Sequence, residues 1–237
     1  TLRTRKGSER HEEEKKEQNR KEERRESLKE IILWIILIFS GFLFGSVMFS
    51  RIIPQITRKK DISELSSDKN PGAANVFKNC GVKLGIICLL LDMLKGFMMP
   101  FIASMLMDTR NFAFSLVMTA PVIGHALGMF NSFKGGKCIS TSFGVMLGIM
   151  PVSRIGFLLA IIYVIFSVIV KINPHTLRSI ISFSLFAVLS LIILPFFGRF
   201  VIALGCLFIS LVAIVKHVVM AKAETEREAD ELESVRK

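Results

Sequence analysis

The chain has 237 residues, of which 51% are hydrophobic, and a formal net charge of +11. Its apolar residues form long runs, which is typical of an integral membrane protein and argues against a single soluble core. The surplus of positive charge lies in the hydrophobic body, where it can flank membrane spans or attract an anionic substrate. Few polar surfaces remain to hold a duplex, so we expect no nucleic acid partner.

The first thirty residues are almost all charged or polar and precede the first apolar run. Glu12 with Lys16, and Glu17 with Lys21, have the four-residue spacing that supports a solvated helix. Disorder is the alternative for such a composition. No small-residue cleavage site follows the first apolar run, so we expect a retained helix rather than a signal peptide.

Seven apolar segments follow, most of them about as long as a membrane span. The fourth is short, and we expect it to be tilted, buried or partly re-entrant. The sequence therefore predicts an all-α integral membrane protein, a seven-span helical bundle with Gly-rich loops at the membrane interface. The predicted spans are 31–53, 83–107, 112–130, 138–151, 155–171, 177–197 and 199–220. The predicted domains are a charged tail (1–30), the membrane domain (31–221) and a second charged tail (222–237).

Basic residues in the short loops indicate the orientation in the membrane. The first, third and fifth loops hold most of them, whereas the second, fourth and sixth hold one each, Arg110, Arg154 and Arg199. We therefore expect the odd loops to be cytoplasmic, with the N-terminus outside and the C-terminus inside. The basic residues of the N-terminal tail favour the opposite orientation.

The four cysteines, Cys80, Cys88, Cys138 and Cys206, include no CxxC pair. At least two of them lie in apolar runs, where free Cys usually behaves as a small buried hydrophobe. We predict neither a disulfide framework nor a metal site.

Three polar clusters interrupt the apolar pattern. The first is "GSVMFSR", Gly45 to Arg51, at the inner end of the first span, followed by the stretch "KNPGAANVFKNCG". Asn70, Pro71 and Gly72 fit a tight turn, and the small residues after it leave backbone N–H groups uncovered, as in an anion-binding nest. The helix expected near Val76 adds its positive N-terminal end. An ordinary loop before an ordinary helix is the alternative.

The second cluster is the pair Asp92 and Lys95 inside the second span. Residues three apart share a helix face and can pair. Ionisable groups inside a membrane are costly and usually face the bundle interior or a cavity. A purely structural ion pair is the alternative to a role at a site.

The third cluster is "GHALGMFNSFKGGKCIST", which combines a histidine with a Gly-rich basic turn. It is not a Walker A loop, because Asn131 and Cys138 stand where that motif needs Gly and Ser or Thr. His125 alone is more often structural. With the first cluster on the same predicted face, however, the two Gly-rich basic loops suggest a site for a phosphorylated small molecule at the cytoplasmic interface.

The order and spacing of "NPGAANVFKNCG", "LDMLKG", "GH" and "FKGGK" resemble the PlsY-type glycerol-3-phosphate acyltransferases over about residues 41–220. These are bacterial seven-span membrane enzymes that transfer an acyl chain from acyl phosphate to the 1-position of glycerol 3-phosphate, giving lysophosphatidic acid. The resemblance implies this activity in the bacterial inner membrane, with the site facing the cytoplasm. We expect a monomer that needs no cofactor.

The resemblance also implies a role for each matching residue. Lys137 with the adjacent Gly backbone would bind one phosphoryl group, and His217 would orient the hydroxyl or a phosphate. The predicted catalytic residues are Lys137, His217 and Ser46. The predicted substrate- or phosphate-binding residues are Asn70, Gly72, Asn75, Lys69, Lys134, Gly135, Gly136 and Thr141. The predicted supporting residues are Asp92, Lys95 and His125.

The chain departs from the family pattern at several positions. Lys69 and Ala74 stand where the family has Gly and Thr, and Cys138 replaces a Gly. The family usually has an Arg shortly before the first loop motif, whereas the stretch "DISELSS" here has none. Met220 and Ala223 stand at the Asn and Arg positions of the C-terminal motif, so Lys216 or Lys222 would have to supply the charge. The alternative function is therefore a non-catalytic or transport-type relative that binds a phosphorylated solute or lipid. A purely structural membrane protein would make both Gly-Lys loops accidental.

Overall fold

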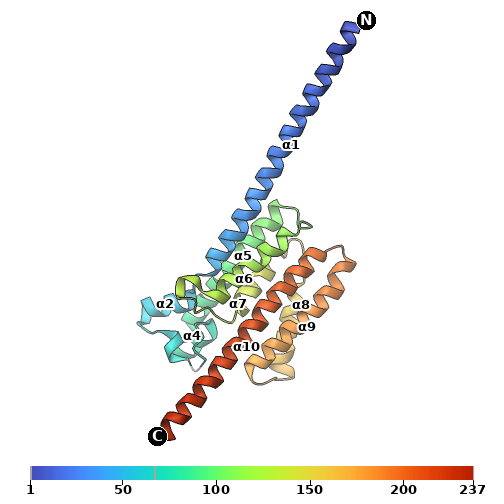
Figure 1. Cartoon of the computed structure of the whole chain (residues 1–237). Coiled ribbons are helices and arrows are strands. Elements are labelled where there is room, and N and C mark those ends of the chain that lie inside the picture. Colours follow the sequence, from blue (N-terminus) through green and yellow to red (C-terminus); the bar gives the residue numbers. More distant parts are fainter. Residues whose placement is uncertain (1, 67, 237) are drawn as a thin grey trace. The chain divides into compact units, whose positions relative to one another are not determined.

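The computed structural model describes the backbone of residues 2–66 and 68–236 and the side chains of residues 15–66, 68–230, 233 and 234. All regular structure in these residues is helical (Figure 1). The elements are α1 (Leu2–Gly45), α2 (Phe49–Arg58), α3 (Ile62–Leu65), α4 (Ala73–Cys80), α5 (Val82–Leu106), α6 (Ala113–Leu127), η1 (Met129–Asn131), α7 (Ile139–Gly148), α8 (Gly156–Val164), η2 (Ile165–Ile169), α9 (His175–Phe196) and α10 (Phe200–Arg236).

The chain divides into two compact units, and the boundary falls inside α1, after Ile36. The first unit is the N-terminal part of that helix. Its exposed face carries the ion pairs Lys21–Glu17 and Lys29–Glu26, each 2.6 Å long. The Glu12 side chain lies outside the described residues. Exposed ion pairs of this kind contribute little to the stability of a helix.

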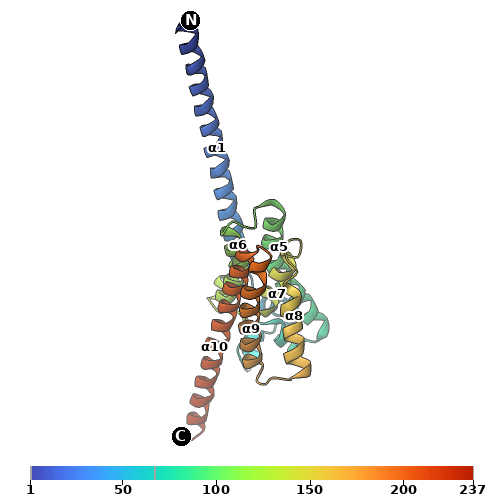
Figure 2. The same ribbon diagram turned by 90° about the vertical axis from the view of Figure 1, so that its right-hand side faces the viewer.

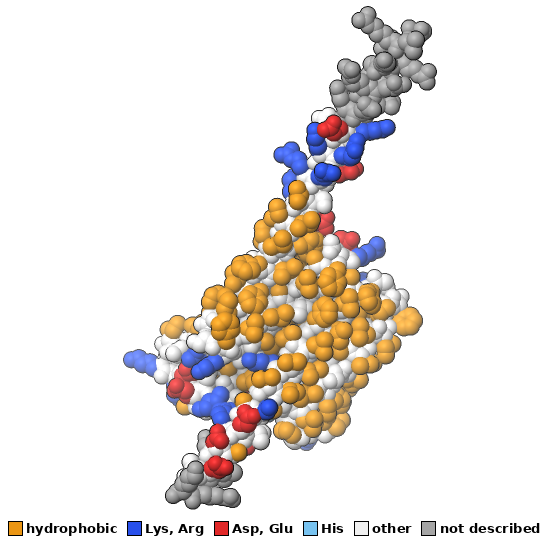
Figure 3. Space-filling model, in the orientation of Figure 1, with side chains coloured by type: hydrophobic (Ala, Val, Ile, Leu, Met, Phe, Trp, Pro, Cys, Tyr) orange, Lys and Arg blue, Asp and Glu red, His pale blue; other side chains and the backbone are white. Residues whose placement is uncertain are grey.

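Within the part of the chain that the structure describes, five helices have the length and hydropathy of a membrane span. They are Lys15–Gly45 in α1, α5, Ala113–Asn131 (α6 with η1), α9 and Phe200–Asp230 in α10. The segments Ile139–Gly148 and Gly156–Ile169 are apolar but shorter. The all-α membrane fold is confirmed, whereas the count of seven full spans stays a prediction. Figure 3 shows hydrophobic side chains covering this face of the bundle, with charged residues gathered over α2, α4 and the end of α10.

The first predicted span, 31–53, ends earlier than its hydropathy suggests, because α1 stops at Gly45 and α2 starts at Phe49. A Cβ on Gly45 would lie 2.2 Å from the carbonyl oxygen of Pro121, and one on Gly124 would lie 2.1 Å from that of Phe42. The backbones of α1 and α6 therefore touch, as small residues allow in membrane bundles. The predicted end of this span was therefore wrong, because hydropathy alone does not mark the break after Gly45.

A second backbone contact joins α5 to α7. A Cβ on Gly144 would lie 2.0 Å from the carbonyl oxygen of Met93, and one on Gly96 would lie 2.2 Å from that of Thr141. The short α7 is thus held along its length by α5. Around it, α10 packs against α9 and α6 (Figure 1, Figure 2).

We expect Gly144→Val to lower the thermal unfolding midpoint of the detergent-purified protein, because the side chain would separate α5 from α7. Overpacking a close contact costs about 1–3 kcal/mol. The control is Leu147→Val on the same helix, where the native side chain is 43% exposed. Equal midpoints for the two variants would show that the backbone contact is not needed for stability.

Candidate functional site

The loop between α3 and α4 is organised by one carboxylate, that of Asp68. Its Oδ1 accepts hydrogen bonds from the backbone N–H of Asn70, at 3.2 Å, and from Nδ2 of Asn75, at 2.9 Å. The Asn75 Nδ2 also donates to the carbonyl oxygen of Asn70, at 2.8 Å. Asn75 therefore uses its amide donors inside the loop and holds the turn that leads into α4. Ser67, at the start of this turn, lies outside the described residues.

Lys137 comes from the Gly-rich loop before α7 and reaches the same carboxylate. Its Nζ donates to the other oxygen of Asp68, Oδ2, at 2.7 Å, and both residues are buried. Nζ also lies 2.7 Å from Nε2 of His175, the first residue of α9. Because an ammonium only donates, Nε2 of His175 must be the unprotonated nitrogen. Three segments distant in sequence thus meet at one lysine.

The ionisation of Asp68 follows from these contacts. Burial raises the pKa of its carboxyl, but the hydrogen bond and charge of Lys137, with the donors from Asn75 and Asn70, outweigh burial and hold the pKa below its usual 3.8. The ion pair is therefore present at neutral pH. The stability that it contributes is present above the unfolded-state pKa and is lost as the pH falls through the folded-state pKa.

A cavity of about 390 Å³ opens beside this ion pair. Its polar lining comes from α4 and the loop before it, from the Gly-rich loop and the start of α7, from the start of α9, and from His125 and Tyr163. Leu89 and Ile139 add apolar surface. Four polar atoms of lining residues are buried without a hydrogen-bond partner among the described residues: Asn70 Oδ1, His125 Nδ1, Tyr163 Oη and Arg178 Nε. Buried polar groups are rarely left unpaired, so these atoms indicate a place for a polar ligand. The cationic lining residues are Lys78, Lys137 and Arg178.

Comparison with known proteins identifies the family. The profile of the glycerol-3-phosphate acyltransferases matches residues 35–223 of this chain. The chain belongs to the glycerol-3-phosphate acyltransferase family. A curated family member from Lactococcus lactis subsp. cremoris is 32% identical over 174 residues, which cover 73% of this chain and 78% of the relative. A member from Hydrogenobaculum sp. is 40% identical over 111 residues, which cover 47% of this chain and 56% of the relative.

Solved structures support the fold. A crystal structure of PlsY, an integral membrane glycerol 3-phosphate acyltransferase, in its glycerol 3-phosphate form, superposes with a TM-score of 0.66. It is 23% identical and covers 86% of this chain and 94% of its own. A structure of the lysophosphatidic acid form gives a TM-score of 0.63, also at 23% identity. The fold of this chain is therefore that of the glycerol-3-phosphate acyltransferase family.

The family site that the sequence predicts is only partly assembled around the cavity. Asn70, Gly72, Asn75, His125 and Lys137 line it. Gly136 lies directly behind, because a Cβ there would be 2.5 Å from His125 Nε2 and 3.3 Å from Asn70 Oδ1. Its N–H donates to the carbonyl oxygen of His125, at 3.1 Å, and the phosphate contact that the resemblance implies for Gly136 stays a prediction.

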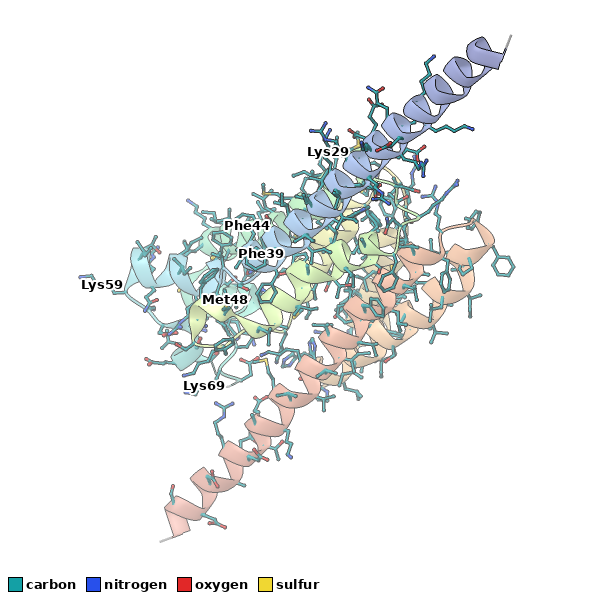
Figure 4. The ribbon with its side chains drawn as sticks, turned by 45° about the horizontal axis from the view of Figure 1, so that its top comes forward. Lys29, Phe39, Phe44, Met48, Lys59 and Lys69 are labelled. Atoms are coloured by element: carbon teal, nitrogen blue, oxygen red, sulfur yellow. The ribbon has the colours of Figure 1, made fainter. Side chains whose placement is uncertain are left out.

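Other predicted residues lie away from the cavity. Ser46 directly follows α1 and is fully buried, and its Oγ donates to the carbonyl oxygen of Phe42 in the last turn of that helix, at 2.9 Å. Lys69 and Lys134 are exposed, and Figure 4 shows Lys69 at the outer edge of the bundle, pointing away from it. Thr141 is buried in the contact between α7 and α5. Gly135 is also buried, with its Cα facing Gly128.

His217, predicted to be catalytic, lies on α10 and is fully buried. Its Nδ1 is 2.8 Å from the carbonyl oxygen of Ala213, one turn earlier. Nε2 has no hydrogen-bond partner among the described residues. The residue does not belong to the cavity lining, so a direct contact with substrate stays a prediction.

The supporting pair has the geometry that its spacing predicts. Lys95 Nζ lies 2.9 Å from Asp92 Oδ1, and both side chains are fully buried. Ser50 donates a hydrogen bond to the other oxygen of Asp92, and Lys95 donates to the carbonyl oxygen of Val47. The pair therefore ties α5 to Val47, in the break between α1 and α2, and to Ser50, in the first turn of α2.

Sequence reasoning missed three members of the site: Asp68, His175 and Arg178. Asp68 stands inside the recognised loop, but only its distance to Lys137, 69 residues away, shows its role. His175 and Arg178 are three residues apart at the start of α9, a spacing that places both on one helix face. This pair of cationic or titratable residues at the end of a span was the available signal.

A second cavity, of about 430 Å³, lies where α7 gives way to α8 and α9 gives way to α10. Arg154 and Arg199 line it together with apolar residues such as Ile193 and Phe197. It contains none of the residues that match the family motifs. The cavity at Lys137 is therefore the candidate site.

Proposed function

We propose that this protein transfers an acyl chain from acyl phosphate to glycerol 3-phosphate, giving 1-acyl-glycerol 3-phosphate and inorganic phosphate. The observation that carries the proposal is the position of Lys137, buried at a cavity with two further cations, in a bundle of the acyltransferase family. Two substrates that each bear a phosphate match a cavity with this charge. We further propose that the protein acts as a monomer in the bacterial inner membrane, with this cavity facing the cytoplasm.

Acyl phosphate is already activated, so the chemistry needs orientation and charge neutralisation rather than a protein nucleophile. The glycerol hydroxyl oxygen forms the new ester bond to the acyl carbon, and the bond from that carbon to the phosphate oxygen breaks. The departing phosphate takes the hydroxyl proton. Lys137 stabilises the charge on one phosphoryl group.

The second phosphate is assigned to Arg178 and Lys78, which line the cavity, in place of the exposed Lys69 and Lys134. Arg178 is suited to this role because its Nε has no hydrogen-bond partner among the described residues. Its guanidinium can also donate two parallel hydrogen bonds to one phosphate. The acyl chain enters between helices from the bilayer, along the apolar part of the lining.

The test is release of phosphate from acyl phosphate by the purified full chain, with and without glycerol 3-phosphate. Release that depends on glycerol 3-phosphate, with formation of the acylated product, supports the proposal. Equal release without the acceptor would contradict it.

A second candidate function is a relative that binds a phosphorylated solute or lipid without turnover. Two observations favour it: Asp68 already occupies Lys137, and Met220 and Ala223 stand at polar positions of the family's C-terminal motif. Binding of glycerol 3-phosphate with no acyl transfer in the same preparation would select this function.

A further inference from the structure

The carboxylate of Asp68 has two oxygens with different partners. Oδ1 accepts hydrogen bonds from Asn70 and Asn75 and so holds the loop. Oδ2 faces outward from that loop to Lys137, at 2.7 Å, and lies 3.9 Å from Nε2 of His175. Oδ1 therefore holds the loop, and Oδ2 brings the negative charge of the carboxylate onto Lys137, the lysine to which the proposed function assigns a substrate phosphate.

An ammonium has three donors, and two of those on Lys137 are directed to Asp68 and His175. A phosphoryl group can reach the third donor, but it then shares the ammonium with the Asp68 carboxylate unless it replaces the bond to Oδ2. The pair is buried, where charges interact more strongly than at the surface. Two anions on one buried ammonium also repel each other, so the resident carboxylate weakens the binding of an incoming phosphate.

We propose that Asp68 is an internal competitor for the phosphate site: its Oδ2 neutralises Lys137 in the free protein and must yield when a phosphorylated substrate binds. This inference rests on the proposed function, because it takes Lys137 as the phosphate ligand. Asp68 thereby sets the affinity of the site and restricts it to ligands whose phosphate can displace a carboxylate.

The variant Asp68→Asn separates the role of the side chain in holding the loop from its negative charge on Lys137. Its side-chain oxygen can still accept from Asn70 and Asn75, while the negative charge on Lys137 is lost. We expect the dissociation constants for glycerol 3-phosphate and for inorganic phosphate, measured by titration calorimetry on the detergent-purified full chain, to fall by about tenfold or more. Asp68→Ser removes both the negative charge and the side-chain carbonyl. It gives a second measurement, and we expect both dissociation constants to fall here too.

The matched control is Asp61→Asn. Asp61 is also a partly buried carboxylate of the same region, but it pairs with Arg51, at 2.8 Å, and does not line the cavity. We expect this variant to bind both ligands like the wild type. A similar gain in both variants would show a general charge effect and overturn the inference.

A double-mutant cycle tests whether Asp68 acts through Lys137. In the Lys137→Ala background, the change Asp68→Asn should alter affinity for glycerol 3-phosphate less than twofold. Wild-type binding that Asp68→Asn leaves unchanged or weakens would overturn the inference while the proposed function stands. If neither the wild type nor either Asp68 variant binds glycerol 3-phosphate, both the proposed function and the inference fail.

Discussion

Lys137→Ala is expected to abolish phosphate release from acyl phosphate in the presence of glycerol 3-phosphate. Loss of one charge-stabilising group at a reacting centre costs about 10²–10³-fold in rate. The Nζ of Lys137 is held by two neighbours, Asp68 and His175, at 2.7 Å each. The measurement is initial rate of phosphate release at saturating acceptor.

This variant leaves Asp68 buried without its charged partner, so loss of folding must be separated from loss of chemistry. The thermal midpoint is therefore measured alongside the rate. The double variant Lys137→Ala with Asp68→Asn removes the unpaired charge and should recover stability without activity. Lys83→Ala, a change at an exposed lysine at the start of α5, is the control for added alanine. Full activity in a folded Lys137→Ala protein would overturn the site assignment.

Lys95→Met is expected to destabilise the protein more than any other single change considered, by about 3–5 kcal/mol, because it leaves Asp92 as an unpaired buried charge. Both side chains are fully buried, and the lysine also holds the carbonyl of Val47. The measurement is the unfolding free energy in detergent. Leu94→Met is the control, since Leu94 is 43% exposed on the same helix.

The double variant Lys95→Met with Asp92→Leu should recover much of the loss, because an apolar pair can replace a buried ion pair. Incomplete recovery is expected from Ser50, which loses its acceptor. If Lys95→Met alone stayed within about 1 kcal/mol of the wild type, the pair would not be a structural tie between α5 and the end of α1.

The contrast between Asp92–Lys95 and Asp68–Lys137 shows what the sequence could predict. The first pair is three residues apart on one helix, so local geometry alone brings the charges together. The second joins residues 69 positions apart, and it depends on how the loop before α4 lies against the loop before α7. Hydropathy likewise located the long apolar helices but not the end of α1 at Gly45.

The site was predicted by motif for Asn70, Asn75 and Lys137, because short Gly-rich loops with basic residues carry their chemistry locally. The sequence did not predict His175 and Arg178 as site residues, because they lie on α9, outside the recognised motifs. Ser46 and Thr141 match the family motifs but lie in contacts with helices α1 and α5. A match to the motif therefore did not predict which residues line the cavity.

The glycine contacts of α1 with α6 and of α5 with α7 have a consequence for how the family can diversify. Where one helix touches another through peptide units alone, the spacing has no side chain that can be exchanged for a slightly longer or shorter one. The frame beneath His125 and Lys137 is therefore close to fixed. New substrate preferences therefore have to arise from the loop side chains that line the cavity, such as Asp68.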